Sequence, residues 1–117
     1  MFDKNTELKK EIVYYAKLLD EKGLVNTLEG NLSILDRETG KMYITPSGTR
    51  KRFLTEDKIA VVKDEEQIEG TVKKSSEILL HEAALKARPD CNAAAHIHAP
   101  YLTAYAYCGK DIKLKCS

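Results

Sequence analysis

Hydrophobic residues near the start of the chain recur at three- and four-residue steps, which is the period of an α-helix. The pattern predicts a helix over residues 5–22, with Asn5 or Thr6 capping its start and Gly23 supplying a left-handed stop. One apolar stripe faces the core and consists of Leu8, Ile12, Tyr15, Ala16 and Leu19.

Short runs of β-forming residues follow this helix. Residues 32–36 and 41–45 flank a turn at 37–40, and the pattern predicts a hairpin. One helical turn is expected at 54–57, and a buried strand is expected over 59–62.

A second helix is expected to begin at Ser75 or Ser76 and to end before Arg88. Its apolar residues form a broad surface, so we expect it to pack on more than one side. The sequence predicts a central strand over residues 91–98 and a third helix over residues 101–108. The order α, β-hairpin, β, α, β, α is typical of a mixed α/β fold.

Length and composition restrict the class of protein. The 117 residues suffice for one core, so we expect a single domain over residues 1–117. A net charge of +1 leaves no basic excess, which argues against nucleic-acid binding. No apolar run reaches the roughly 18 residues of a membrane span, and no secretory signal is recognisable at the N-terminus.

The cysteines and the basic clusters suggest nothing unusual. Cys91, Cys108 and Cys116 fit no zinc-finger spacing, and without an export signal we expect reduced thiols and a cytoplasmic location. We interpret the basic stretches at 9–10, 50–52 and 73–74 as solvated faces.

His96 and His98 are the sharpest local feature. Residues two apart in a strand lie on one face, where two imidazoles can hold one divalent metal. Because a catalytic zinc usually takes three protein ligands, the pair alone leaves open whether these residues bind metal or are unrelated surface histidines.

Glu77 lies in the first turn of the expected second helix, where the helix dipole favours a carboxylate. Ordinary helix capping is the simpler interpretation. Beside a metal, the same carboxylate could take a proton from a carbon next to a carbonyl. His81 lies one turn later on the same face, and we interpret it as structural or supporting rather than as a metal ligand.

Several small polar residues could bind a phosphate. Ser75 and Ser76 precede the second helix, whose first backbone amides suit an anion. Asn31 after Gly30, and Ser47 with Gly48, add amides and polar side chains on loops, although turn formation alone would explain each pair.

Six motifs in this order resemble the class II aldolase/adducin N-terminal family. They are Gly30-Asn31-Leu32-Ser33, Tyr43-Ile44-Thr45-Pro46-Ser47-Gly48, Ser75-Ser76-Glu77, His81, Ala87-Arg88-Pro89-Asp90 and His96-Ile97-His98. The resemblance is closest to the L-fuculose-1-phosphate aldolase type. It implies a three-layer α/β arrangement, C-terminally shortened, with a largely antiparallel sheet flanked by helices.

The resemblance also implies zinc-dependent retro-aldol cleavage of a ketose 1-phosphate, such as fuculose 1-phosphate to dihydroxyacetone phosphate and lactaldehyde. His96 and His98 match two zinc ligands of the family. Glu77 matches its acid/base carboxylate, which can also approach the zinc. The family's phosphate-binding positions match Asn31, Ser47, Gly48, Ser75 and Ser76.

Two related activities and one non-catalytic role stay open. Pentulose-phosphate 4-epimerases share the fold but commonly carry Asp where this chain has Glu77, which favours an aldolase. Members resembling methylthioribulose-phosphate dehydratase keep Glu, and adducin-like members keep the fold as non-catalytic assembly domains. The family usually has a third zinc His downstream, and His81 matches a non-ligand position. We expect one zinc per chain if the site is complete, and a homo-oligomer like the family's tetramers.

Overall fold

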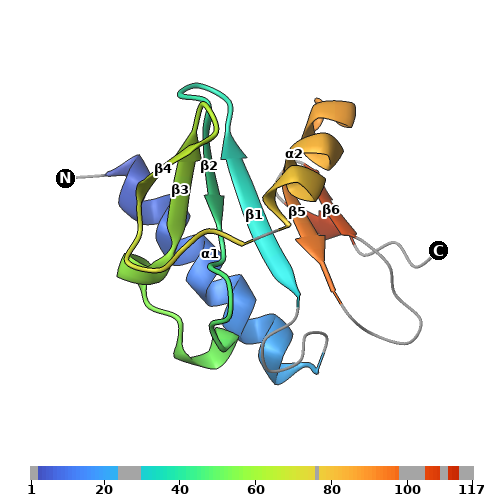
Figure 1. Cartoon of the computed structure of the whole chain (residues 1–117). Helices are drawn as coiled ribbons and strands as arrows, with labels where there is room; N and C mark the ends of the chain where they lie inside the picture. Colours follow the sequence, from blue (N-terminus) through green and yellow to red (C-terminus); the bar gives the residue numbers. More distant parts are fainter. Residues whose placement is uncertain (1–2, 24–29, 76, 98–104, 109–110, 114–117) are drawn as a thin grey trace.

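A β-sheet forms the centre of the molecule. The computed structural model describes residues 3–23, 30–75, 77–97, 105–108 and 111–113 of the chain. Seven strands lie in the order β4-β3-β2-β1-β5-β6-β7, and all neighbouring pairs are antiparallel (Figure 1). The elements in chain order are α1 (Lys4–Glu21), β1 (Asn31–Asp36), β2 (Lys41–Ile44), η1 (Lys51–Phe53), η2 (Glu56–Lys58), β3 (Ala60–Lys63), β4 (Glu66–Glu69), α2 (Ile78–Ala87), β5 (Cys91–His96), β6 (Tyr105–Cys108) and β7 (Asp111–Lys113).

One helix covers each face of this sheet. In Figure 1, α1 lies behind β1 and β2, whereas α2 lies in front of β5. Alternation along β2 sends Met42 and Ile44 to the α2 side and Tyr43 to the α1 side. The expected three-layer arrangement, with an antiparallel sheet flanked by helices, is therefore confirmed.

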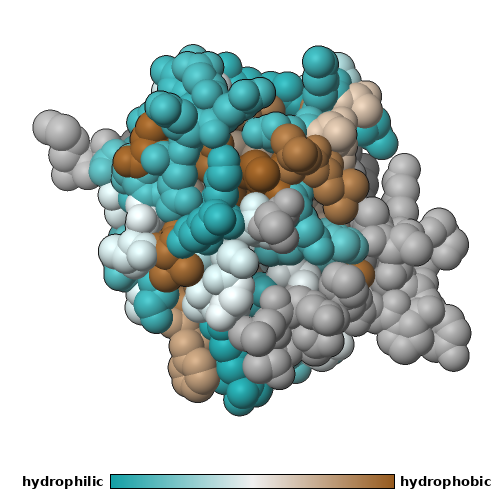
Figure 2. Space-filling model, in the orientation of Figure 1, coloured by the Kyte–Doolittle hydropathy of each residue, from teal (hydrophilic) through white to brown (hydrophobic). Residues whose placement is uncertain are grey.

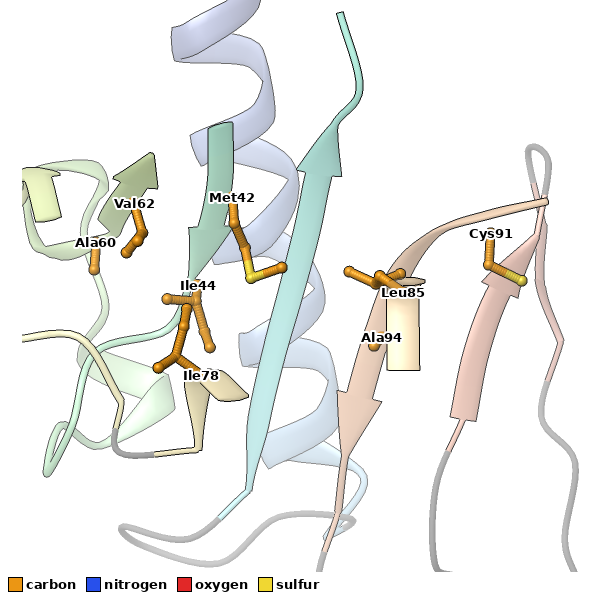
Figure 3. Packing of buried hydrophobic residues seen from close by; sticks show 8 residues of the cluster. All are labelled: Met42, Ile44, Ala60, Val62, Ile78, Leu85, Cys91 and Ala94. Atoms are coloured by element: carbon orange, nitrogen blue, oxygen red, sulfur yellow. The ribbon is translucent and has the colours of Figure 1, made fainter. Parts of the chain in front are cut away.

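The packing of α2 fixes the residue that precedes it. Ile78 and Leu85 are 7% and 1% exposed and pack against the sheet (Figure 3). Burying side chains of this size contributes roughly 1.5–3 kcal/mol each. Because Ile78 is anchored in this way, the backbone of Glu77 is held close to the sheet. The sheet residues of this cluster are Met42, Ile44, Ala60, Val62, Cys91 and Ala94.

The expectation that the second helix packs on more than one side is wrong. Leu79 is 71% exposed and Leu80 is 52% exposed, and Figure 2 shows hydrophobic atoms gathered over α2. Only Ile78, His81 and Leu85 are buried, at the three- and four-residue spacing of a single helix face. Leu79 and Leu80 lie outside that face, and they made the apolar surface predicted from the sequence broader than the buried one.

The first helix and the hairpin confirm most of the local predictions. Register pairs from Ser33–Ile44 to Asp36–Lys41 join β1 to β2. Gly23 has a positive φ of 72°, as the predicted left-handed stop requires. The N-cap of α1 is Asp3 rather than Asn5 or Thr6, because its carboxylate accepts a hydrogen bond from the Asn5 backbone amide.

The expected third helix is wrong over the residues that the structure describes in this region. Residues 105–108 form β6, which pairs antiparallel with β5, and residues 101–104 lie outside the described part. Tyr-Ala-Tyr-Cys alternates and contains two strand-favouring aromatic residues. Pairing with β6 also satisfies backbone groups that β5 would otherwise expose at an edge.

Cys91 is disulfide-bonded, so the expectation of reduced thiols is wrong for this residue. It is fully buried at the start of β5, and Cys108 lies opposite it in the register with β6. The sequence spacing of the cysteines could not show this cross-strand position.

Within the described residues, no helix has both the length and the apolar character needed to cross a bilayer.

Candidate functional site

Three elements meet at the candidate site. Asn31 opens β1 and His96 closes β5, and the two residues lie opposite each other in the antiparallel register. Both face the α2 side of the sheet, since Ala94, two residues before His96, packs in the cluster on that side. Glu77 directly precedes α2, the helix that packs on this face, and is the third residue of the site.

The Glu77 carboxylate joins these residues instead of capping its helix. Its Oε2 accepts a hydrogen bond from Asn31 Nδ2 at 2.9 Å and a second one from His96 Nδ1. Glu77 is the N-cap residue of α2, yet its side chain makes no capping hydrogen bond. The interpretation of Glu77 as an ordinary helix cap is therefore wrong.

Ser75 supplies local support at this helix start. Its buried hydroxyl oxygen accepts a hydrogen bond from the Glu77 backbone amide at 3.1 Å. An amide that α2 would otherwise leave without an acceptor is thus satisfied from two residues upstream. This contact frees the Glu77 side chain for Asn31 and His96.

The electrostatic balance at Glu77 favours its charged form. Burial acts to raise the pKa of Glu77, but the hydrogen bonds from His96 and Asn31 outweigh it and lower the pKa below its usual value. The carboxylate is therefore ionised at neutral pH and acts as the acceptor of both hydrogen bonds.

A buried hydroxyl fixes the orientation of the Asn31 amide. Thr45 Oγ1 donates to Asn31 Oδ1 at 3.3 Å and accepts from the Leu32 backbone amide at 3.2 Å. The amide oxygen is thus engaged by Thr45, and the amide nitrogen points at Glu77. Thr45 belongs to a motif of the family resemblance, but nothing in its sequence position singled it out for this role.

His81 confirms the interpretation as a structural residue. It is 2% exposed, and its Nδ1 lies 2.6 Å from the Ser33 hydroxyl. Burial lowers the pKa of His81 from 6.5 to about 4, so the ring is neutral at physiological pH. Its contact with Ser33 joins α2 to β1.

The expected phosphate-binding residues are only partly brought together. Ser47 and Gly48 lie exposed on the loop after β2, and Gly48 has a positive φ of 65°. The Ser47 amide donates to the Lys73 carbonyl at 2.9 Å, which joins this loop to the segment that leads to Ser75. Ser76 and His98 lie outside the described residues.

Lys51 was missed by the sequence interpretation, which assigned the basic stretch 50–52 to a solvated face. Lys51 is only 2% exposed, whereas Arg52 is exposed and forms an ion pair with Asp20. A run of three basic residues gives no signal of which one is buried, since burial depends on how η1 packs against α1.

The residues around Glu77 suit part of a metal site. Imidazole and carboxylate are zinc ligands, and a metal-binding His usually donates its second ring N–H to a carboxylate or carbonyl. His96 makes such a contact to Glu77 through Nδ1. The part of the chain that the structure describes contains no group of three or more His, Cys, Asp or Glu placed to hold a metal.

Comparison with protein families identifies the family of this fold. The family model described as Class II Aldolase and Adducin N-terminal domain matches residues 10–116. The chain belongs to this family. The resemblance inferred from the six sequence motifs is thereby confirmed.

Curated relatives in the class II aldolase and adducin family include two kinds of enzyme. A 5-deoxy-D-ribulose 1-phosphate aldolase from Bacillus thuringiensis serovar kurstaki is 38% identical over 105 residues, which cover 89% of this chain and 49% of the relative. L-Ribulose-5-phosphate 4-epimerase UlaF from Salmonella typhi is 34% identical over 105 residues, which cover 88% and 46%. The chain thus spans about half the length of these relatives.

Solved structures of the family agree. An L-fuculose 1-phosphate aldolase superposes with a TM-score of 0.76 at 35% identity, covering 86% of this chain and 47% of that chain. YgbL from Escherichia coli, described as a putative aldolase/epimerase/decarboxylase, superposes with a TM-score of 0.75 at 28% identity, covering 83% and 46%.

Proposed function

We propose that this chain carries the acid/base and phosphate-binding half of a class II aldolase that cleaves a ketose 1-phosphate. The observation that supports it concerns the Glu77 carboxylate. This group makes no capping hydrogen bond to its own helix and instead accepts hydrogen bonds from Asn31 and His96. A positioned, ionised carboxylate beside an imidazole suits proton transfer at a carbon next to a carbonyl.

The proposed reaction breaks the C3–C4 bond of the substrate. Fuculose 1-phosphate would give dihydroxyacetone phosphate and lactaldehyde, and 5-deoxyribulose 1-phosphate would give dihydroxyacetone phosphate and acetaldehyde. In this scheme the C4 hydroxyl loses its proton to the ionised Glu77 carboxylate, directly or through water, as it becomes the aldehyde carbonyl and the C3–C4 bond breaks. Glu77 then gives that proton to C3 of the dihydroxyacetone phosphate fragment and is a carboxylate again. Asn31 and His96 keep the carboxylate oriented during the transfer.

The family implies a zinc ion, and His96, His98 and Glu77 are the residues that would hold it in this chain. When bound, zinc supplies positive charge that stabilises oxyanions beside it. The phosphate end of the substrate would meet Ser47, Gly48, Ser75, Ser76 and Asn31. We also propose a homo-oligomer, which the exposed Leu79 and Leu80 on α2 support.

Two measurements test this proposal. The first is zinc per chain by elemental analysis of the purified protein, with His96→Ala as the variant. We expect about one zinc per chain in the wild type and a clear loss in the variant. Unchanged zinc in His96→Ala would defeat the ligand assignment.

The second measurement is release of dihydroxyacetone phosphate from fuculose 1-phosphate and from 5-deoxyribulose 1-phosphate, coupled to NADH oxidation. Release from either substrate supports the aldolase. Interconversion of ribulose 5-phosphate and xylulose 5-phosphate without that release would favour the epimerase instead. A metal-free chain of defined oligomeric state, with neither activity, would indicate an adducin-like assembly domain.

A further inference from the structure

Lys51 is a buried cation that no described residue neutralises through a hydrogen bond. Its side chain is 2% exposed, and its Nζ has no acceptor within the described part of the chain. Lysine is almost never fully buried without a partner, because an ammonium loses its hydration on burial. Such an unpaired charge calls for a functional explanation.

Two carboxylates act on Lys51, but both are engaged elsewhere. Asp20 accepts a hydrogen bond from the Arg52 backbone amide at 3.0 Å and forms an ion pair with the Arg52 guanidinium. Glu77 accepts from Asn31 and His96. Burial lowers the pKa of Lys51, and the charges of Asp20 and Glu77 offset this only in part.

The position of Lys51 relates it to the candidate site. It follows Ser47 by four residues and Gly48 by three on the same loop, and it opens η1. That loop is joined to the segment leading to Ser75 through Ser47–Lys73 and the Pro46–Lys74 bridge. Through these contacts the loop that carries Lys51 lies beside the segment that leads to Glu77.

We propose that Lys51 is a substrate-binding residue whose ammonium pairs with the phosphate group of the substrate beside Ser47 and Gly48. An arriving dianion would supply the acceptors that the described residues do not. Four rotatable side-chain bonds let the ammonium approach the anion without backbone movement. The inference rests on the proposed function, and it adds a charged group to a phosphate site otherwise made of amides and small polar residues.

Inorganic phosphate is the probe, because its binding is measurable without turnover. Titration calorimetry at constant ionic strength would compare the wild type with Lys51→Met, which keeps most of the stem and removes the charge. We expect phosphate to bind the variant about 10- to 100-fold more weakly, the loss expected for a charge-assisted hydrogen bond. Lys63→Met removes an exposed lysine charge on β3 and should bind phosphate like the wild type.

Two further variants separate charge from packing. Lys51→Arg should keep phosphate binding within a few-fold of the wild type, whereas Lys51→Gln should lose it. This comparison decides the matter even if Lys51→Met does not fold. In phosphate-free buffer, Lys51→Met should be at least as stable as the wild type, because it removes an unpaired buried charge.

The outcomes distinguish this inference from the proposed function. Wild-type protein that does not bind phosphate, or Lys51→Met and Lys51→Gln that bind it normally, would overturn the role of Lys51. Phosphate binding through Lys51 with no release of dihydroxyacetone phosphate would overturn only the aldolase. In an active enzyme, Lys51→Met should raise KM for the ketose 1-phosphate much more than it lowers kcat.

Discussion

The two α-helices that the structure describes both begin beside an acidic residue, but they use it differently. At the start of α1, the Asp3 carboxylate accepts hydrogen bonds from the Asn5 amide at 3.2 Å and from the Thr6 hydroxyl at 2.7 Å. At the start of α2, the Glu77 carboxylate makes no such bond and turns to Asn31 and His96.

The difference teaches how a fold frees a carboxylate for chemistry. Asp3 satisfies groups of its own helix and is exposed. For Glu77, the buried Ser75 hydroxyl takes over the backbone amide, and the packing of Ile78 holds the helix in place. A helix that needs no cap from its acidic residue can present that residue to a neighbouring strand.

The largest expected effect comes from Glu77→Gln. The amide keeps the size of the side chain but cannot exchange a proton at neutral pH. We expect kcat for release of dihydroxyacetone phosphate to fall about 10²- to 10⁴-fold. The fold and the zinc content should be retained, because His96, His98 and the oxygen of the new amide side chain remain to hold the metal. Steady-state kinetics, circular dichroism and elemental analysis measure the three quantities. Undiminished turnover in this variant would end the assignment of Glu77 as the acid/base.

An intermediate effect, on the pH dependence of stability, is expected from His81 in the first turns of α2. Its pKa is about 4 in the folded chain against 6.5 for an unperturbed histidine, so the unfolded chain binds a proton more readily between these values. Stability is therefore full above about pH 6.5 and is lost as the pH falls toward 4. The loss from this group is roughly 3 kcal/mol.

Urea unfolding of the wild type and of His81→Gln between pH 7 and pH 4.5 measures this dependence. The variant lacks the titrating ring, so its free energy of unfolding should change much less over the interval. Equal slopes for the two proteins would show that His81 is not held neutral by burial.

The smallest effect is expected from Asp3→Asn, the matched control for Glu77→Gln. The substitution also replaces a carboxylate at a helix start by an amide of the same size. We expect a slight decrease in Tm, because asparagine is also a good N-cap, and no change in kcat. A fall in kcat comparable to that of Glu77→Gln would remove the contrast between the two helix starts.

Local patterns predicted the elements that depend on neighbours in sequence. The 3.6-residue stripe of α1 and the two strands around 37–40 were found because each pattern repeats within a few residues. The same method overestimated the burial of α2, since Leu79 and Leu80 add apolar character without facing the sheet. The strand at 105–108 depends on pairing with β5, which no local pattern contains.

The candidate site shows a similar division. Family motifs placed Asn31, Glu77 and His96 in one group, but only the fold shows that Glu77 contacts both of the others. Glu77 and His96 are 19 residues apart, and Asn31 and Glu77 are 46 apart. The burial of Lys51 depends on the packing of η1 against α1, so a basic run predicted the wrong environment.

The pairing of Asn31 with His96 across β1 and β5 limits how this gene can change in length. A single codon inserted within β5 would turn His96, which closes the strand, to the opposite face of the sheet. One inserted within β1 would reverse the face of Asn31 relative to the residues that follow it in the strand. Either change would remove one partner from Glu77. Codons inserted in the 37–40 turn would leave this pairing unchanged. Comparing insertions and deletions among natural relatives should therefore show gaps at that turn and almost none inside β1 or β5.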